Sequence, residues 1–187
     1  DVIVSNCGSS CVLCLTVGLS FVVPDCLPEW SQLGAGWNGD KENDRNGNSV
    51  SLNGTGSRVA IGTPGADTTN GVNSGKTDIL EYSPALGWTQ VGDPILGYDQ
   101  EVDSGWSVSM NDDGDRVAVG SRISNDNGSR SGRTTIYQLI GSTWTEIAFI
   151  DGSSEDDFLG SSVSMNAEGT RVAMGAPGGA DGYTRIY

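Results

Sequence analysis

The sequence predicts an all-β protein built from repeated antiparallel sheets, and three observations predict it. A hairpin-like segment occurs three times, as SVSLNGTGSRVAIG at 49–62, SVSMNDDGDRVAVG at 107–120 and SVSMNAEGTRVAMG at 162–175. The spacing of the copies is nearly constant and lies in the range typical of repeat architectures. The 187 residues include 28 glycines and only 7% aromatic residues, a composition typical of short strands joined by many turns.

Each copy predicts four strands in a fixed order. The repeated segment supplies two strands and the tight turn between them. A polar, glycine-rich loop follows, and then a third strand, at 76–82, 133–139 and 183–187. The fourth strand opens with tryptophan, at Trp88 and Trp144, and WSQLG at Trp30 matches it ahead of the first copy. Four strands joined by turns predict antiparallel meanders, with repeats over about 30–87, 88–143 and 144–187.

Side-chain alternation predicts how these sheets pack. In the middle copy, Val108 and Met110 share one face of a strand, and Ser107 and Ser109 share the other. The small face carries Ser, Ala and Gly instead of charges, so we expect another sheet to approach it closely, with large side chains against small ones. Four-stranded sheets stacked in this way around an axis make a β-propeller, which is the predicted fold class. A β-sandwich is the alternative, but it gives no reason for a fixed repeat.

Residues 1–29 lie outside the repeats and predict an extended, cysteine-rich arm. All four cysteines are here, Cys7, Cys11, Cys14 and Cys26, which favours local disulfides formed in an oxidising compartment. Three pairings are open. A zinc site is the alternative, but only Cys11 and Cys14 have the usual spacing. The apolar run 11–23 is too short to span a bilayer and no basic residue precedes it, so we expect neither membrane insertion nor a signal peptide.

The charge balance restricts the partners and the chemistry. A formal net charge of −14 repels nucleic acid and anionic membranes. The chain has no histidine, so it cannot build a Ser-His-Asp or Cys-His nucleophile on its own. We therefore expect no enzyme and no catalytic residues. The sequons at Asn53 and Asn127 predict glycosylation and agree with an extracellular place.

The three copies resemble a known family. GWSVSMNDDGDRVAVGS, LGSSVSMNAEGTRVAMGAP and GNSVSLNGTGSRVAIGTP are similar to the FG-GAP repeats of integrin-α-like β-propellers. They resemble more closely the tandem WTQLG…SVSL…DGxRVAIGAP repeats of large secreted or surface proteins of algae and other microbes. The resemblance covers about residues 30–187. It implies a propeller fold, an extracellular or cell-surface location, and adhesion or scaffolding work.

Calcium is the one cofactor that the sequence suggests. The calcium loop of integrin-type blades is shorter here, so we place no ion at the hairpin turn. A second acidic loop precedes the first strand of each copy, and alternating oxygen ligands suit calcium. Solvated loop charge is the alternative interpretation. The candidate ligands are Asp40, Glu42, Asp44, Asp99, Glu101, Asp103, Glu155, Asp156 and Asp157.

Three repeats leave a sheet stack unfinished, because propellers usually close with four to eight blades. A longer natural array is one explanation. The other is a head-to-tail contact in which Trp30, Ser31, Gln32 and Leu33 form an assembly strand on a neighbouring copy. We therefore expect an extracellular structural protein that assembles with copies of itself into a fibre, appendage or matrix. A calcium-dependent adhesion or ligand-binding propeller, with glycans as further partners, is the alternative function.

Overall fold

The computed structural model describes residues 12–14, 20–22 and 30–187. The chain divides into two compact units, Asp1–Leu33 and Gly34–Tyr187. In the first unit, β1 (Val12–Cys14) pairs antiparallel with β2 (Ser20–Val22). The predicted disulfide residues lie outside the described residues, apart from the backbone of Cys14.

The second unit begins with a sheet whose strands follow chain order. Its path is β3-β4-β5-β6, all antiparallel, with the short strand β7 pairing with the other end of β5. Strands β3 and β4 form the predicted hairpin, and β6 carries Trp88. The bounds are β3 (Ser49–Leu52), β4 (Arg58–Thr63), β5 (Lys76–Ser83), β6 (Gly87–Gln90) and β7 (Ile95–Leu96).

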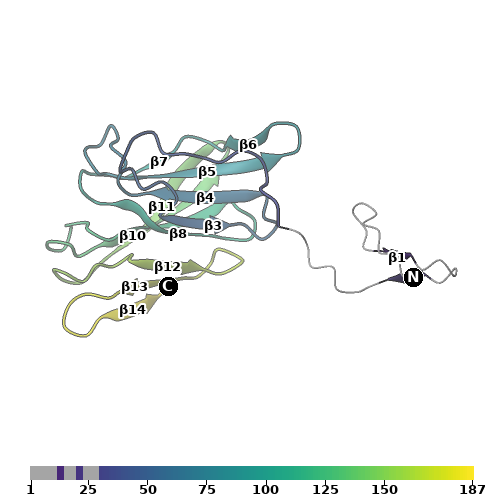
Figure 1. Ribbon diagram of the computed structural model, residues 1–187. Helices are drawn as coiled ribbons and strands as arrows, with labels where there is room; N and C mark the ends of the chain where they lie inside the picture. The colour runs from purple at the N-terminus through teal and green to yellow at the C-terminus, as the bar shows by residue number, and fades with distance from the viewer. Residues whose placement is uncertain (1–11, 15–19, 23–29) are drawn as a thin grey trace. The chain divides into compact units, whose positions relative to one another are not determined.

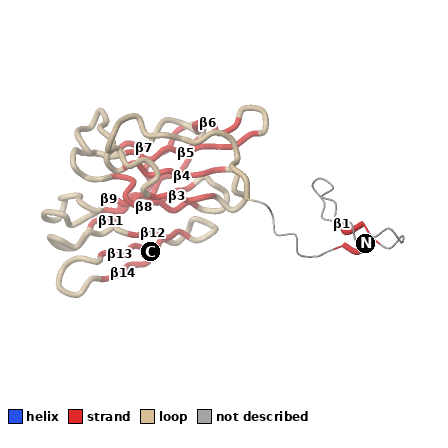
Figure 2. The backbone as a smooth tube through the Cα atoms, viewed as in Figure 1, coloured by secondary structure: helices blue, strands red, loops and turns tan. Residues whose placement is uncertain are grey.

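Two more sheets repeat this order. The second sheet is β8-β9-β10-β11 and the third is β12-β13-β14, again antiparallel throughout. The bounds are β8 (Ser104–Met110), β9 (Arg116–Ser121), β10 (Arg133–Ile140), β11 (Thr143–Asp151), β12 (Ser162–Met165), β13 (Val172–Ala176) and β14 (Tyr183–Ile186). Figure 2 shows strands and loops but no helix in the part of the chain that it describes. The all-β prediction is confirmed.

The register makes the sheets equivalent residue by residue. Val59 pairs with Leu80 in the first sheet, and Val117 pairs with Tyr137 in the second. In the third sheet, Val172 exchanges two backbone hydrogen bonds with Tyr187, at 2.9 and 3.0 Å. Tyr187 therefore stands at the position of Leu80 and Tyr137.

One asparagine organises the hairpin turn in each copy. The side-chain Oδ1 of Asn53 accepts the backbone N–H of Arg58, and Asn111 and Asn166 accept the equivalent N–H groups. The glycine three residues after each asparagine has φ between 65° and 70°, a left-handed conformation that glycine adopts without strain. The motif N-x-x-G-x-R is thus a turn signature.

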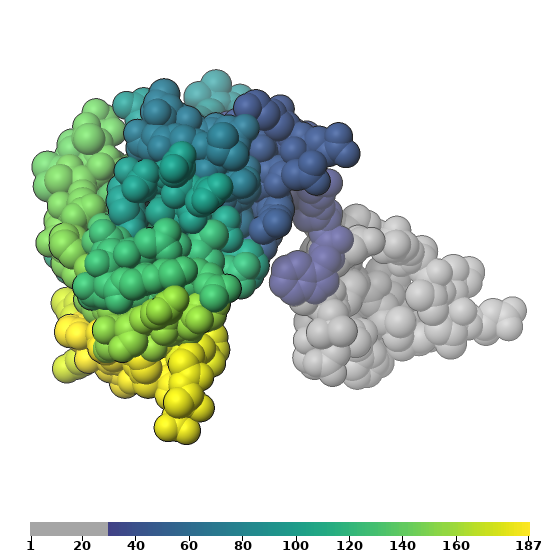
Figure 3. Space-filling model, turned by 90° about the vertical axis from the view of Figure 1, so that its left-hand side faces the viewer, coloured from purple at the N-terminus to yellow at the C-terminus, as the bar shows by residue number. Residues whose placement is uncertain are grey.

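The sheets lie in chain order, as the colours of Figures 1 and 3 show from blue through green to yellow. One buried hydrophobic cluster lies between the first and second sheets and includes Ile79, Met110 and Trp144. A second lies between the second and third sheets and includes Ile136 and Met174. The large side chains of one sheet therefore pack on the face of the preceding sheet that carries Ser, Ala and Gly, as the alternation predicted.

Candidate assembly interface

The contact between consecutive sheets is made by serine hydroxyls of one sheet and the backbone of the next. Ser49 of β3 donates its hydroxyl to the carbonyl of Gly105 at 2.9 Å. Ser51 accepts the backbone N–H of Met110 at 3.0 Å. The face of the first sheet that carries Ser and Gly therefore meets the face of the second sheet that carries Val108 and Met110, both buried.

The same contact recurs one sheet further along. Ser107 donates to the carbonyl of Gly160 at 2.7 Å, and Ser109 accepts the N–H of Met165 at 2.9 Å. The interface is thus a repeated unit with a small face on one side and a large face on the other.

Glycine is required where the sheets touch most closely. A Cβ on Gly62 would lie 2.0 Å from the carbonyl oxygen of Gly105, and one on Gly120 would lie 2.1 Å from that of Gly160. No side chain fits at either distance. Gly105 and Gly160 both have φ of 86°, so each carbonyl reaches the neighbouring sheet from a left-handed residue.

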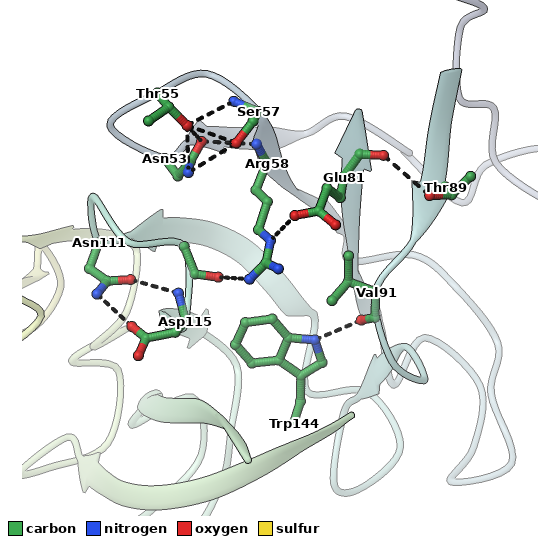
Figure 4. A network of polar contacts seen from close by, with 11 residues as sticks. Asn53, Thr55, Ser57, Arg58, Glu81, Thr89, Val91, Asn111, Asp115 and Trp144 are labelled. Carbon is green, nitrogen blue, oxygen red and sulfur yellow. Dashed lines mark hydrogen bonds and ion pairs between the residues drawn. The ribbon is translucent and has the colours of Figure 1, made fainter. Parts of the chain in front are cut away.

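An arginine crosses each interface at the hairpin end. The Nη1 of Arg58 donates to the carbonyl of Gly114 at 3.1 Å, and Arg116 donates to Gly169 at 2.9 Å. Figure 4 shows Arg58 held on its other side by Glu81, whose Oε1 lies 2.8 Å from Nε. The arginine of the turn signature therefore fixes the position of the next hairpin.

A tryptophan closes the outer side of the first interface. Trp144 of β11 is only 9% exposed, and its indole N–H donates to the carbonyl of Val91 at 2.9 Å (Figure 4). The residue that follows Val91 is Gly92, and a Cβ there would lie 3.2 Å from the Trp144 ring. Trp144 is therefore a packing residue of this interface.

The first sheet leaves its large face open. Val50 is 64% and Leu52 59% exposed, whereas their equivalents Val108 and Met110 are 8% and 5% exposed. Nothing lies within 4 Å of a Cβ built on Gly47 or Gly56, although the equivalents in the next copy are in tight contact. We call these four residues, Val50, Leu52, Gly47 and Gly56, the front face.

The third sheet leaves its small face open. Ser162 and Ser164 are exposed, and a Cβ on Gly175 would meet only the side chain of Ser162. Arg171, the equivalent of Arg116, is also exposed. A hollow of about 580 Å³ runs over Ser162, Gly175 and Thr184. We call Ser162, Ser164, Arg171 and Gly175 the rear face.

The acidic loops use several of their carboxylates within the fold, and calcium binding stays a prediction. No group of three or more Asp, Glu, Cys or His residues is placed to hold a metal ion within the described ranges. Asp44 is buried and accepts the backbone N–H groups of Asp40 and Lys41. Asp157 accepts those of Ser153 and Ser154 in the same way. The two carboxylates act as loop caps.

The remaining acidic candidates face bases or water. When the three copies are aligned, the buried Val102 is the equivalent of Asp44 and Asp157, and Asp103 lies one residue later. Burial raises the pKa of Asp103, and Arg122, 3.7 Å away, opposes that shift. Asp40 pairs with Lys76 at 2.6 Å and Asp156 with Arg130 at 2.6 Å. Four candidates are exposed on loops: Glu42, Asp99, Glu101 and Glu155.

A cation begins the third strand in the first two sheets and neutralises nearby acids. Burial alone would lower the pKa of Lys76, but its hydrogen bond to Asp40 and the charge of the buried Asp78 raise the pKa overall. Arg133 holds Asp151 and Asp126 in the second sheet. These pairs tie the acidic loops to the sheets.

The predicted glycosylation sites take part in the fold. The Nδ2 of Asn53 donates to Thr55, and the residue is 9% exposed because it caps the turn (Figure 4). The Nδ2 of Asn127 donates to the carbonyl of Gly152 at 2.9 Å, although the residue is exposed. Glycosylation stays a prediction, and at Asn53 it requires the folded turn to open.

The predicted assembly strand is not a strand in the single chain. Residues 30–33 have no assigned secondary structure, and the indole of Trp30 is 95% exposed. The pairing of Trp30, Ser31, Gln32 and Leu33 with another copy stays a prediction.

Comparisons with known proteins do not assign the chain to a family. No protein-family model and no curated protein matches the chain. Among solved structures, the chain is similar to hydrazine synthase of Kuenenia stuttgartiensis, with 16% identity and a TM-score of 0.45. The match covers 74% of this chain and 44% of that one, so the chain spans less than half of its length. A likeness this distant carries no functional argument, and the FG-GAP resemblance stays a prediction.

No helix among the described residues has the length and apolar character needed to cross a membrane.

Proposed function

We propose that the protein is an extracellular, non-catalytic building block whose copies join head to tail. The front face of one copy packs on the rear face of the next. One observation carries this proposal: the two exposed end faces are the two halves of an interface that the chain already makes twice within itself.

The expected contacts follow from the internal ones. Ser162 takes the role of Ser49 and Ser107 and donates to the carbonyl of Gly47. Gly175 takes the role of Gly62 and Gly120 and leaves room for that carbonyl. Arg171 takes the role of Arg58 and donates to the carbonyl of Gly56.

Burial of apolar area supplies the driving force. Val50 and Leu52 enter the hollow of the rear face, as Val108 and Met110 enter the space over Ser51 and Gly62. Full burial of an aliphatic side chain contributes roughly 1.5–3 kcal/mol. Two such side chains at the centre of a contact are enough to act as anchors.

A repeated contact of this kind is heterologous. It yields a closed ring if the rotation between copies closes, and a filament if it does not. Two copies would give a six-bladed propeller, which is a common closed number, whereas a continuing stack gives a fibre. Both are architectures of structural proteins.

The composition supports an extracellular place. The net charge of −14 keeps copies soluble until their end faces meet, and four cysteines within the first 26 residues suit an oxidising compartment. The exposed edge of an unfinished stack needs a cover, and another copy supplies one.

Replacement of Leu52 by aspartate tests the proposal. Sedimentation velocity over a range of concentrations should show that the unmodified chain forms larger species and that Leu52→Asp stays monomeric. The matched control is Leu86→Asp, because Leu86 is 77% exposed but lies in the β5–β6 turn, away from the end faces. Monomers at all concentrations for the unmodified chain, or equal association of both variants, would refute the proposal.

A further inference from the structure

Trp144 sits in a defined socket between the first and second sheets. Val91 accepts its indole N–H and Gly92 leaves space beside the ring. The same hydrophobic cluster holds side chains from both sheets against it. These residues are Ile79, Ile95, Met110, Val117 and the half-buried Tyr137.

The equivalent socket between the second and third sheets is open. A cavity of about 360 Å³ lies there, and several residues of its lining are equivalent to the surroundings of Trp144. Ala148 takes the place of Gly92, and Ile147, the residue before it, takes the place of Val91. The remaining equivalents in the lining are Ile136, Ile150, Met165, Val172 and Tyr187.

The edge of the third sheet next to this socket is also open. In the first sheet, β5 pairs with the tryptophan strand β6, and in the second, β10 pairs with β11. Among the described residues no strand pairs with the outer side of β14. Ile186 and Tyr187 at this edge are 72% and 57% exposed.

A matching tryptophan lies at the other end of the same chain. Trp30 opens WSQLG, as Trp88 opens WTQVG and Trp144 opens WTEIA. A Cβ on Gly34 would lie 3.2 Å from the Trp88 ring, just as one on Gly92 would lie 3.2 Å from the Trp144 ring. Gly34 therefore lies beside the tryptophan of the first sheet in the same way as Gly92 lies beside the tryptophan of the second sheet. The segment before Gly34 therefore matches, in sequence, the fourth strand that a preceding sheet would supply.

We infer that the open socket binds the indole of Trp30 from a second copy. The Trp30 indole N–H donates to the carbonyl of Ile147, and Gln32 meets Tyr187 along β14, as Gln90 meets Leu80. This inference rests on the proposed head-to-tail assembly and adds a specific anchor to it. The sheet that follows Gly34 then stacks on the third sheet with the geometry of the internal interfaces.

Complementation between two variants tests the inference. Trp30→Ala removes the indole and keeps the socket, whereas Ala148→Phe fills the exposed socket and keeps the indole. Each variant alone should lose self-association by about 30-fold or more in dissociation constant, the equivalent of a hot-spot residue. An equimolar mixture should regain one contact and form a dimer that cannot extend. Trp37→Ala is the control, since Trp37 is 40% exposed but lies outside the motif.

The outcomes separate the inference from the proposed function. Association that survives Trp30→Ala but is lost in Leu52→Asp would overturn the socket and leave head-to-tail assembly intact. Two defective variants that fail to complement each other would show that Trp30 fills the socket of its own chain, which overturns a second copy as the occupant. Recovery of a dimer in the mixture supports the inference.

A peptide reports on the socket even if the chain is monomeric. Residues 30–36, WSQLGAG, are titrated into the Trp30→Ala chain while the methyl resonance of Met165 is followed by NMR. The expected result is a saturable shift that is absent with ASQLGAG and with the Trp30→Ala/Ala148→Phe chain. Equal shifts with both peptides, or no shift, would contradict the inference.

Discussion

The two spaces between consecutive sheets differ most in the presence of a tryptophan side chain. Between the first and second sheets, Trp144 fills the outer end of the core and hydrogen bonds to Val91. Between the second and third sheets, a similar lining leaves a cavity of about 360 Å³. The serine, glycine and arginine contacts are the same in both. The stacking therefore does not depend on the tryptophan, which acts as a separate wedge.

The two ends of the stack differ in the size of the side chains that they expose. The front face exposes large side chains and the rear face exposes small ones, and no described sheet of the second unit covers either face. Each end is complementary to the other and not to itself. We propose on this basis that copies join in one direction, as head-to-tail building blocks do.

Trp144→Ala should give the largest effect. The substitution empties the filled socket and leaves the N–H acceptor of Val91 without its donor, so we expect a loss of about 3–5 kcal/mol in the free energy of unfolding. Trp30→Ala should leave the unfolding free energy of the monomer unchanged. Urea denaturation at low protein concentration measures both. Equal losses of unfolding free energy in the two variants would contradict this difference between a buried Trp144 and an exposed Trp30.

Gly120→Ala and Gly175→Ala compare a covered contact with an open one. A Cβ at Gly120 would clash with the carbonyl of Gly160, so the sheets must separate, at a cost of ~1–3 kcal/mol. Gly175→Ala meets only the side chain of Ser162 and should keep its stability, but it should block association. Thermal unfolding and sedimentation together provide the comparison. If the Gly175→Ala chain still associates, the rear face does not form the contact between copies.

Arg116→Gln and Arg171→Gln compare the crossing arginines. Arg116 donates to Gly169, and its loss should destabilise the fold by about 1 kcal/mol, since the side chain is half-buried. Arg171 is exposed, so its replacement should change association and not stability. The readout is the urea midpoint of the two variants at low concentration. A matching loss in Arg171→Gln would place that guanidinium in a contact within the chain.

The smallest effect at neutral pH concerns Tyr137. Burial, aided by the nearby charge of Glu146, raises the pKa of Tyr137 to about 12. The unfolded chain then releases this proton at lower pH than the folded chain, so the contribution to stability is complete below about pH 10 and is lost as the pH rises toward 12. Tyr137→Phe should flatten this decline in stability. Unfolding midpoints between about pH 9 and 12, the titration range of tyrosine, provide the measurement.

Most of the fold was predictable because the repeat carries its own structure. N-x-x-G-x-R marks the turn, the Ser and Val alternation marks the two faces, and the third strands fall within one residue of their predicted ends. The packing of large against small side chains also followed from this alternation. The propeller itself stays a prediction, because local pattern does not set the rotation between sheets.

The site was predicted less well. The acidic loops were aligned by their charge, but their backbones align by Asp44, Val102 and Asp157, so the charges of the middle loop are out of step. A capping carboxylate and a calcium ligand look alike in a sequence, and only the direction of the oxygens tells them apart. The Trp30 motif was recognised, but its socket needs the three-dimensional equivalence of Ala148 with Gly92.

The central claim is that the ends of the stack join as its interior does, and a cryo-electron-microscopy structure of the associated chain tests it most directly. The expected result places Ser162 and Gly175 of one copy against the Gly47 carbonyl of the next, as Ser49 and Gly62 meet that of Gly105. Copies joined through other surfaces, with Val50 and Leu52 still in water, would contradict it.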